Sequence, residues 1–487
     1  MPTRRDVLLA AAAASLVNAS RGRAQTPPPA PAPTVLRLQR RSIEVNGKPA
    51  SVFGITQPDG THGITTAIGQ QFRVRVENAI DEPSLIHWHG LTPPSQQDGV
   101  PGISAPPIPP GGSADYDFPL TFGGTYWMHS HEGLQEQLLM SAPLIIRDPR
   151  EPPDRQEVVV MLSDFSFAPP EQIMAGLKRP MAGMSPMANM HMQGGKPAMA
   201  PGMQMAASGG AAPDAPAKPD LNDVAYDAFL ANDRTLADPF VAKVEPGATV
   251  LLRIINGSSM SAFHIDLGRR GGTLIAVDGH PIQPLSGHRF PIAVAQRLDI
   301  LVTMPRGPSV RPVLAVLEGE SRRTGIVLAA GTARVAKIDD QSAEPSQALT
   351  LDMERHLRSA HPLQPRKADR ILRVDLTGNM AAYVWSLNNV VWTKDTPPLQ
   401  VAKGERVAIV MTNKTMMPHP MHLHGHVFQV VQIDHQRLSG AMRDTVLVPP
   451  GSRVTVAFDA DNPGLWAFHC HLLYHMEAGM FQTIRYV

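Results

Sequence analysis

The chain has 487 residues, with 44 Lys and Arg against 43 Asp and Glu, and a formal net charge of +1. This balance argues against nucleic acid as a partner, because a nucleic-acid-binding face must neutralise phosphates. At roughly 100–200 residues per domain, the length predicts about three domains. The 48 prolines and 39 glycines favour short strands joined by turns over a helical bundle.

The first 25 residues have the layout of an export signal. Arg4 and Arg5 precede an apolar run at 7–17, and Gly22-Arg23-Ala24 supplies a small-residue cleavage site. The run is too short to span a membrane, so we expect no membrane span. The paired arginines resemble the twin-arginine signal, with an ordinary secretion signal as the alternative. We therefore expect a periplasmic protein.

Three strands with one spacing predict an internal repeat. Gly69, Gly247 and Gly404 are each followed by apolar residues at three, five and seven positions and by Asn at nine. Alternating apolar positions that close on Asn are typical of a half-buried strand entering a turn. We therefore predict an all-β fold of three related domains, at 35–150, 155–340 and 345–487.

Histidine pairs follow these strands in the first and last copies. Their sequences are His87-Trp88-His89 and His422-Leu423-His424, while the middle copy has only His264-Ile265-Asp266. A second element, five residues from Gly to His, adds one more pair to each outer copy: His129-Ser130-His131 and His469-Cys470-His471. The middle copy has no counterpart, and we interpret the middle domain as a spacer.

Two histidines at i and i+2 of a strand point to the same face. Five His-x-His pairs occur, where random placement of 19 histidines would give about 0.7. A single pair could be a solvated surface pair. The two pairs of each outer domain together supply eight imidazoles, and we expect them to converge on a metal cluster where the two domains meet.

The lone cysteine, Cys470, lies between two of these histidines and should point to the opposite face of its strand. With His419, His475 and Met480 it forms a thiolate, two imidazoles and a thioether, the ligand set of blue copper. The alternative is an inert buried cysteine. In the first domain Ser84 and Ser130 stand where His419 and Cys470 stand in the last. Only the last domain can therefore hold the blue site.

These motifs, in this order and spacing, resemble the multicopper oxidases, which include laccases and periplasmic cuprous oxidases. The resemblance covers about residues 35–487 and implies three cupredoxin-like Greek-key β-barrel or sandwich domains with four copper ions. It implies type 1 copper at His419, Cys470, His475 and Met480, and type 2 copper at His87 and His422. It implies a type 3 pair held by His89, His129 and His471 on one ion and by His131, His424 and His469 on the other.

The resemblance also indicates acidic residues. Asp98 is similar in placement to the family's acidic residue near the cluster, a candidate proton donor, although an Asp before Gly also suits a plain turn. Asp444 resembles an acidic residue near the type 1 edge of cuprous oxidases. In some relatives a Glu follows the type 1 histidine, but here that position is Met476, which leaves the second proton donor open.

Nine of the 24 methionines lie between Met174 and Met205. They belong to a stretch at about 168–220 that is rich in Pro, Gly and Ala, which predicts a flexible insertion. Thioether sulfur selects Cu(I), so the segment is a candidate for extra Cu(I), with a plain linker as the alternative.

The sequence thus predicts an oxidase that takes electrons from Cu(I), phenolic compounds or both, reduces dioxygen to water, and has a role in copper tolerance. One alternative is a general laccase with an inert linker at 168–220. The other is a non-enzymatic periplasmic copper-binding protein.

Overall fold

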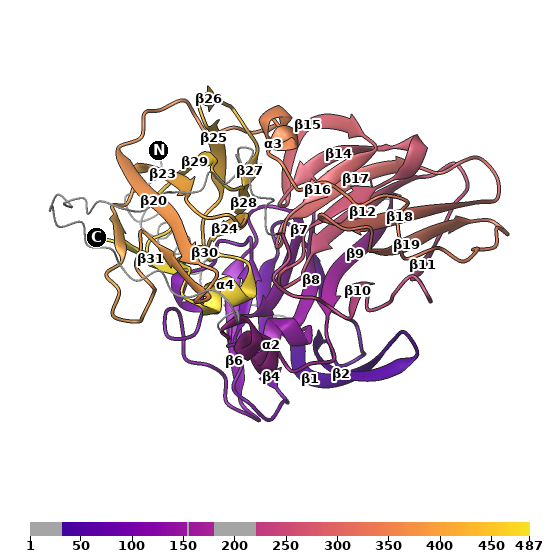
Figure 1. The fold of residues 1–487 in the computed structure, drawn as a ribbon, viewed down its shortest axis with the longest axis horizontal. Helices are drawn as coiled ribbons and strands as arrows, with labels where there is room; N and C mark the ends of the chain where they lie inside the picture. Colours follow the sequence, from indigo (N-terminus) through magenta and orange to yellow (C-terminus); the bar gives the residue numbers. More distant parts are fainter. Residues whose placement is uncertain (1–31, 153–154, 180–220) are drawn as a thin grey trace, which may run out of the picture. The chain divides into compact units, whose positions relative to one another are not determined.

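The structure, a computed structural model, describes residues 32–152, 155–179 and 221–487, and the expected export signal lies outside these residues. The described residues from 34 to 487 form one unit built from three pairs of β-sheets that follow one another along the chain (Figure 1). The predicted all-β fold is confirmed.

The first pair has sheets of strand order β2-β1-β4-β6 and β3-β8-β7-β5. Its strands are β1 Thr34–Val45, β2 Lys48–Thr56, β3 Ile64–Ala67, β4 Gln71–Asn78, β5 Ile86–His89, β6 Ser113–Pro119, β7 Gly124–Ser130 and β8 Ser141–Arg147.

The second pair has sheets of order β10-β9-β12-β17-β14-β15 and β11-β19-β18-β13-β16. Its strands are β9 Gln156–Phe165, β10 Ala228–Ala231, β11 Val241–Val244, β12 Thr249–Asn256, β13 Phe263–Asp266, β14 Gly272–Val277, β15 His280–Gly287, β16 Arg289–Ile292, β17 Arg297–Thr303, β18 Ser309–Leu317 and β19 Arg323–Ala330.

The third pair has sheets of order β21-β20-β23-β29-β25-β26, with β27 beside β25, and β22-β31-β30-β24-β28. Its strands are β20 Arg370–Asn379, β21 Val384–Leu387, β22 Leu399–Val401, β23 Arg406–Asn413, β24 His419–Leu423, β25 Phe428–Ile433, β26 Gln436–Arg437, β27 Met442–Arg443, β28 Thr445–Val448, β29 Arg453–Asp459, β30 Leu465–Cys470 and β31 Phe481–Tyr486.

The predicted repeat strands are β4, β12 and β23, and each ends at its Asn. All three pair parallel with a preceding strand and antiparallel with a later one. The predicted half-buried pattern is confirmed for β4, in which buried residues alternate with more exposed ones. It is wrong for β12, in which every residue after the first is buried. Its Arg253 is 1% exposed and donates to Thr125 Oγ1 of β7, because the first sheet pair covers this strand.

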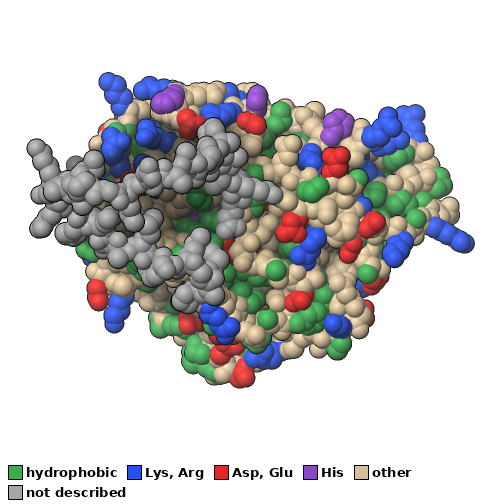
Figure 2. All heavy atoms as spheres, viewed as in Figure 1, with side chains coloured by type: hydrophobic (Ala, Val, Ile, Leu, Met, Phe, Trp, Pro, Cys, Tyr) green, Lys and Arg blue, Asp and Glu red, His purple; other side chains and the backbone are tan. Residues whose placement is uncertain are grey.

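Short helices occur in the connections between strands: α2 Pro170–Leu177, α3 Asp352–His356, α4 Leu473–Glu477, and the 3-10 turns η1 Ser95–Gln97, η2 Gln135–Leu138 and η3 Gly268–Arg270. No helix among the described residues is long and apolar enough to cross a membrane. On the face in Figure 2, acidic and basic side chains are interspersed, in keeping with the small net charge.

The flexible insertion was expected to begin at about residue 168, and this start is wrong. Residues 168–179 contain α2, where Pro170 occupies the first turn and suits a helix start. Met174 is buried in the core that spans the second and third sheet pairs, so it packs as an ordinary apolar side chain. The remaining methionine-rich segment, 180–220, lies outside the described residues.

Candidate metal centres

The four predicted histidine pairs come together on four strands. In the antiparallel register His87 of β5 lies opposite His129 of β7, and His422 of β24 opposite His469 of β30. The sheet that contains β5 and β7 meets the sheet that contains β24 and β30 through these imidazoles. The rings of His89 and His422 stack with centroids 3.8 Å apart. The expected convergence of the first and last domains is confirmed.

The eight imidazoles form three groups, and within each group the candidate ligand atoms lie within 4.8 Å of one another. The groups are His87, His89 and His422; His89, His129 and His471; and His131, His424 and His469. Every group takes residues from both the first and the third sheet pair.

The imidazoles keep one nitrogen for a ligand. His87 Nδ1 donates to the Asp98 carbonyl at 2.8 Å, and His422 Nδ1 to the Asp444 carbonyl at 2.9 Å. In the described part of the chain, five buried nitrogens of the cluster histidines have no hydrogen-bond partner: His87 Nε2, His89 Nδ1, His129 Nε2, His422 Nε2 and His471 Nε2. A buried polar atom without a partner is costly, and metal ions bound in these groups would satisfy all five nitrogens.

Burial favours the neutral form of three of these imidazoles, those of His131, His424 and His471. Loss of solvation, followed by the influence of neighbouring histidines, holds the pKa of His131, His424 and His471 well below the usual value. Neutral imidazole is the form that binds metal. His424 Nε2 and His469 Nε2 face each other at 2.9 Å, an arrangement that a bound cation would relieve. The residues therefore fit a copper cluster.

Three buried carboxylates surround this cluster. Asp98 Oδ2 accepts from His424 Nδ1 at 2.8 Å, so Asp98 lies where the sequence placed it. Glu136 of η2, which the sequence did not single out, has Oε2 2.8 Å from His129 Nδ1. Glu136 follows His131 by five residues. The repeat did not indicate it, because the corresponding position in the last domain, five residues after His471, is Met476.

Asp444 was expected near the type 1 edge, and this expectation is wrong. In the β24–β28 register His419 lies opposite Val448, whereas His422 lies opposite Thr445. Asp444 is therefore one residue beyond the partner of His422, at the histidine cluster. Its Oδ1 accepts from His89 Nε2 at 3.0 Å.

Cys470 points away from the cluster to a second site. Its Sγ lies 3.5 Å from His419 Nδ1 and 3.9 Å from His475 Nδ1, and all three residues are buried. Burial raises the pKa of the thiol above its usual value. Met480 is fully buried beside them, with its backbone N–H donating to His475 and its carbonyl accepting from Cys470.

The first domain has hydroxyls in the place of this second site. Ser84 Oγ and Ser130 Oγ lie 3.5 Å apart, and each donates to Gln135 Oε1 at 2.7 Å. Hydroxyls held by an amide offer no soft ligand. Among the described residues, the thiol-containing group occurs only in the last domain, as predicted.

The outer nitrogens of both histidines beside Cys470 are already hydrogen-bonded. His475 Nε2 donates to Asp223 Oδ2 at 2.9 Å, and His419 Nε2 lies 2.7 Å from Thr415 Oγ1. Tyr383 also donates to Asp223 Oδ2, at 2.7 Å, while the other carboxylate oxygen has no partner among the described residues. Asp223 was not anticipated, because no local motif marks a contact that spans 252 positions.

Two further histidines of the described chain make structural hydrogen bonds. His426 is buried, with Nδ1 bonded to the His424 carbonyl and Nε2 to Tyr486 Oη. His264 of the middle copy binds the Gln347 carbonyl.

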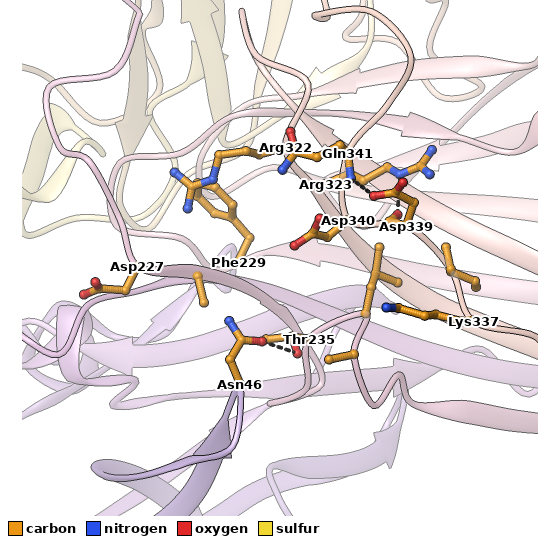
Figure 3. A pocket seen from close by; sticks show the side chains of 14 residues that line it. Asn46, Asp227, Phe229, Thr235, Arg322, Arg323, Lys337, Asp339, Asp340 and Gln341 are labelled. Carbon is orange, nitrogen blue, oxygen red and sulfur yellow. Dashed lines mark hydrogen bonds between the residues drawn. The ribbon is translucent and has the colours of Figure 1, made fainter.

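A cavity of about 550 Å³ lies between β10 and the segment 337–341, lined by Arg322, Arg323, Lys337 and Asp340 among others (Figure 3). None of the predicted ligands lines it, so we do not regard it as the redox site.

Comparison with known proteins agrees with these centres. Family models described as multicopper oxidase match residues 38–151, 156–321 and 366–486. The multicopper oxidase MmcO of Mycobacterium tuberculosis is 32% identical over 87% of this chain and 81% of its own length. A copper resistance protein A homolog of Pseudomonas syringae pv. tomato is 30% identical over 86% of each chain.

The fold agrees as well. The crystal structure of Fet3p, a multicopper oxidase that functions in iron import, superposes with a TM-score of 0.75 at 21% identity, covering 93% of this chain and 90% of that one. The chain thus belongs to the multicopper oxidase family, whose three domains have the cupredoxin fold. It is a copper-dependent oxidoreductase that uses dioxygen, and its cofactors are the four copper ions of the family.

Proposed function

We propose that twelve residues hold the four copper ions as follows. Type 1 copper is held by His419, Cys470, His475 and Met480, and type 2 copper by His87 and His422. The type 3 pair is held by His89, His129 and His471 and by His131, His424 and His469. The observation that carries this assignment is the division of the ligand atoms into three histidine groups and one separate thiol group. The domain boundaries at 35–150, 155–340 and 345–487 belong to the same proposal.

When bound, the coppers accept electrons singly from the reductant at type 1 and deliver four to dioxygen, giving water. The chain connects the two sites within β30, because Cys470 lies between His469 and His471. Protons for water formation enter through Asp98, whose carboxylate is buried against His424 and leaves Oδ1 without a hydrogen bond in the described structure.

The reductant in this proposal is Cu(I). A phenol would hydrogen-bond to an exposed imidazole nitrogen, but the outer nitrogens of His419 and His475 are bonded internally and both residues are fully buried. The unpartnered Oδ1 of Asp223 offers a carboxylate oxygen one hydrogen bond from His475, which suits a cation. A role in copper tolerance follows, in keeping with the name of the copper resistance relative.

Extra Cu(I) at the methionine-rich segment is part of the proposal, although these methionines lie outside the described residues. The soft thioethers select Cu(I). The chain re-enters the described structure at Leu221, two residues before Asp223, so the segment is tethered to the site where electrons would enter. Export to the periplasm by the twin-arginine route completes the proposal, on the strength of Arg4 and Arg5.

The test is oxygen consumption with Cu(I) and with a phenol, at matched copper content, before and after deletion of residues 181–205. This deletion spares α2 and Asp223. We expect Cu(I) oxidation to fall by about tenfold, because the tethered sites raise the local Cu(I) concentration, and phenol oxidation to be unchanged. Equal loss on both substrates, or no loss on Cu(I), would contradict the role of the segment.

The alternatives give different results in the same assay. A general laccase would oxidise phenols faster than Cu(I), with or without the segment. A non-enzymatic copper carrier would consume no oxygen with either reductant. A copper-loaded protein without strong blue absorption would argue against the type 1 assignment itself.

A further inference from the structure

Arg297, the first residue of β17, is fully buried and uses all five of its N–H donors. Nε donates to the Thr125 carbonyl at 3.1 Å, Nη1 to the Ala295 carbonyl at 3.0 Å and Nη2 to the Asp278 carbonyl at 3.0 Å. The two remaining donors bind both oxygens of Asp444, Nη1 to Oδ1 at 2.8 Å and Nη2 to Oδ2. One side chain of the middle domain thus connects all three sheet pairs.

The backbone around Arg297 is held in an uncommon conformation. Ala295 and Asp278, whose carbonyls accept from the guanidinium, have φ of 68° and 49°. Positive φ is unfavourable for residues with a Cβ, least so for Asp, and persists where the surroundings impose it. Gly90 has φ of 89°, and a Cβ there would lie 2.6 Å from Arg297 Nη2 and 2.7 Å from Asp444 Oδ2. The residue after His89 must therefore be glycine for the pair to pack.

The carboxylate of Asp444 determines how His89 faces the cluster. Among the cluster histidines with an unpartnered buried nitrogen, four present Nε2 and only His89 presents Nδ1. His89 is also the one whose Nε2 donates to Asp444 Oδ1, at 3.0 Å. Because a neutral imidazole has one N–H, this bond leaves Nδ1 as the nitrogen that can bind metal.

Asp444 also orients a histidine from the third sheet pair. Its carbonyl accepts from His422 Nδ1 at 2.9 Å and so directs His422 Nε2 to the cluster. Thr445 Oγ1 donates to Asp444 Oδ1 at 2.9 Å, which completes the set of donors on that oxygen. One residue therefore orients a ligand from each of the two outer domains.

We infer that Arg297 and Asp444 form a positioning pair, through which the middle domain orients His89 and His422 for copper. The inference rests on the proposed copper centres. It changes the interpretation of the middle domain, which was expected to be a spacer. In Asp444→Asn the amide has one oxygen, so His89 and Arg297 compete for it and His89 is no longer fixed in one tautomer.

The experiment compares Asp444→Asn and Arg297→Lys with Asp299→Asn. Asp299 is a matched control on the same strand as Arg297: its buried carboxylate accepts from Arg253 and Thr125 Oγ1. Copper retention against a chelator is measured by metal analysis, with the type 2 paramagnetic resonance signal and the blue absorption recorded on the same samples. Blue absorption reports whether the third domain is folded.

We expect Asp444→Asn to weaken cluster copper by about 10- to 100-fold, as loss of a hydrogen-bond partner of a metal ligand commonly does. Loss of copper at the type 3 position of His89 should alter the signal of the neighbouring type 2 copper, while the blue absorption stays. Arg297→Lys keeps the positive charge but loses the planar guanidinium that binds both oxygens of Asp444, and it should show the same pattern more weakly. If Asp444→Asn fails to fold, Arg297→Lys still tests the positioning role of the pair. Asp299→Asn should retain cluster copper.

Equal copper loss in Asp299→Asn and Asp444→Asn would overturn the inference, because the effect would then be general destabilisation. Unchanged cluster copper and type 2 signal in both Asp444→Asn and Arg297→Lys would also overturn it. A wild-type protein that fails to take up four coppers would instead refute the proposed function.

Discussion

Cys470 and Ser130 occupy corresponding positions in β30 and β7, each between two cluster histidines. Replacing Cys470 by Ser should abolish the blue absorption and reduce oxidase activity to background, because a hydroxyl is a poor ligand for type 1 copper. Cluster copper should remain, since Cys470 faces away from it. Visible absorption and copper content per chain check this result. Ser130→Ala is the control and should stay blue.

Asp98 is the residue on which the proposed proton supply depends. Asp98→Asn should lower kcat by about 100-fold, a typical loss for a general acid, without changing the blue absorption. Glu136→Gln is a useful comparison because it also removes a buried carboxylate that contacts the cluster. An unchanged kcat in Asp98→Asn would leave Asp98 as a turn residue only.

Glu318 makes stability depend on pH. Burial, partly offset by the hydrogen bond from the Leu349 N–H, raises its pKa to about 7 from an ordinary 4.5. Between these values the folded state binds more protons than the unfolded state, so the free energy of unfolding falls as pH rises. The loss is complete above about pH 7 and amounts to about 3 kcal/mol.

Glu318→Gln should remove this dependence and be more stable than the wild type at pH 8, though not at pH 4. Denaturant unfolding at both pH values measures the difference. Glu320→Gln, two residues along and partly exposed, is the matched control. If Glu318→Gln kept the wild-type slope, the raised pKa would be wrong.

At the scale of elements, the repeat was predictable because its reason is local. Asn78, Asn256 and Asn413 close β4, β12 and β23, and each amide nitrogen donates to two backbone carbonyls. Each side-chain oxygen accepts from the N–H two residues on. An Asx turn at a strand end explains why Asn recurs at that position.

The four histidine pairs were predictable for a similar reason, because strand alternation fixes which side chains share a face. The hydrogen-bond partners of the metal-site histidines could not be predicted from the sequence. Arg297 and Asp444 are 147 positions apart, and His475 and Asp223 are 252 apart. Such contacts depend on how the sheet pairs dock, which no local periodicity encodes.

The loop 257–261 shows how one strand supports another element. Asp164 of β9 accepts from the N–H groups of Ser259, Met260 and Ser261 at 2.9–3.0 Å. The Ser259 carbonyl in turn accepts from the Leu473 N–H at the start of α4, which carries His475. The loop therefore connects the second sheet pair to the type 1 site.

Asp164→Ala should destabilise the protein by about 3 kcal/mol, because it leaves three buried N–H groups without their acceptor. It should also broaden the type 1 copper signal by loosening α4. Unfolding curves and paramagnetic resonance of the copper-loaded variant test both effects. Asp227→Ala is the control, because it removes a similar carboxylate acceptor at an exposed site, bonded to Ser166 and Phe167. It should neither destabilise the protein nor broaden the type 1 copper signal.

At the scale of the whole molecule, the cluster joins two ends of the chain. Each histidine group draws on the first and third sheet pairs, whereas the thiol group lies within the third. Copper at the cluster can therefore bind only when these two domains are docked, and copper at the type 1 site does not require docking. The two kinds of copper should stabilise the molecule differently.

Removing all copper should lower Tm, since a ligand that binds only the folded state adds about 2.7 kcal/mol at a concentration 100 times its Kd. Most of that shift should come from the cluster. Cys470→Ser keeps the cluster coppers and should retain most of the Tm shift. His131→Gln keeps the type 1 site and should lose most of the Tm shift. Scanning calorimetry of the copper-loaded and copper-free forms measures each shift. Equal shifts in the two variants would mean that the cluster does not hold the outer domains together.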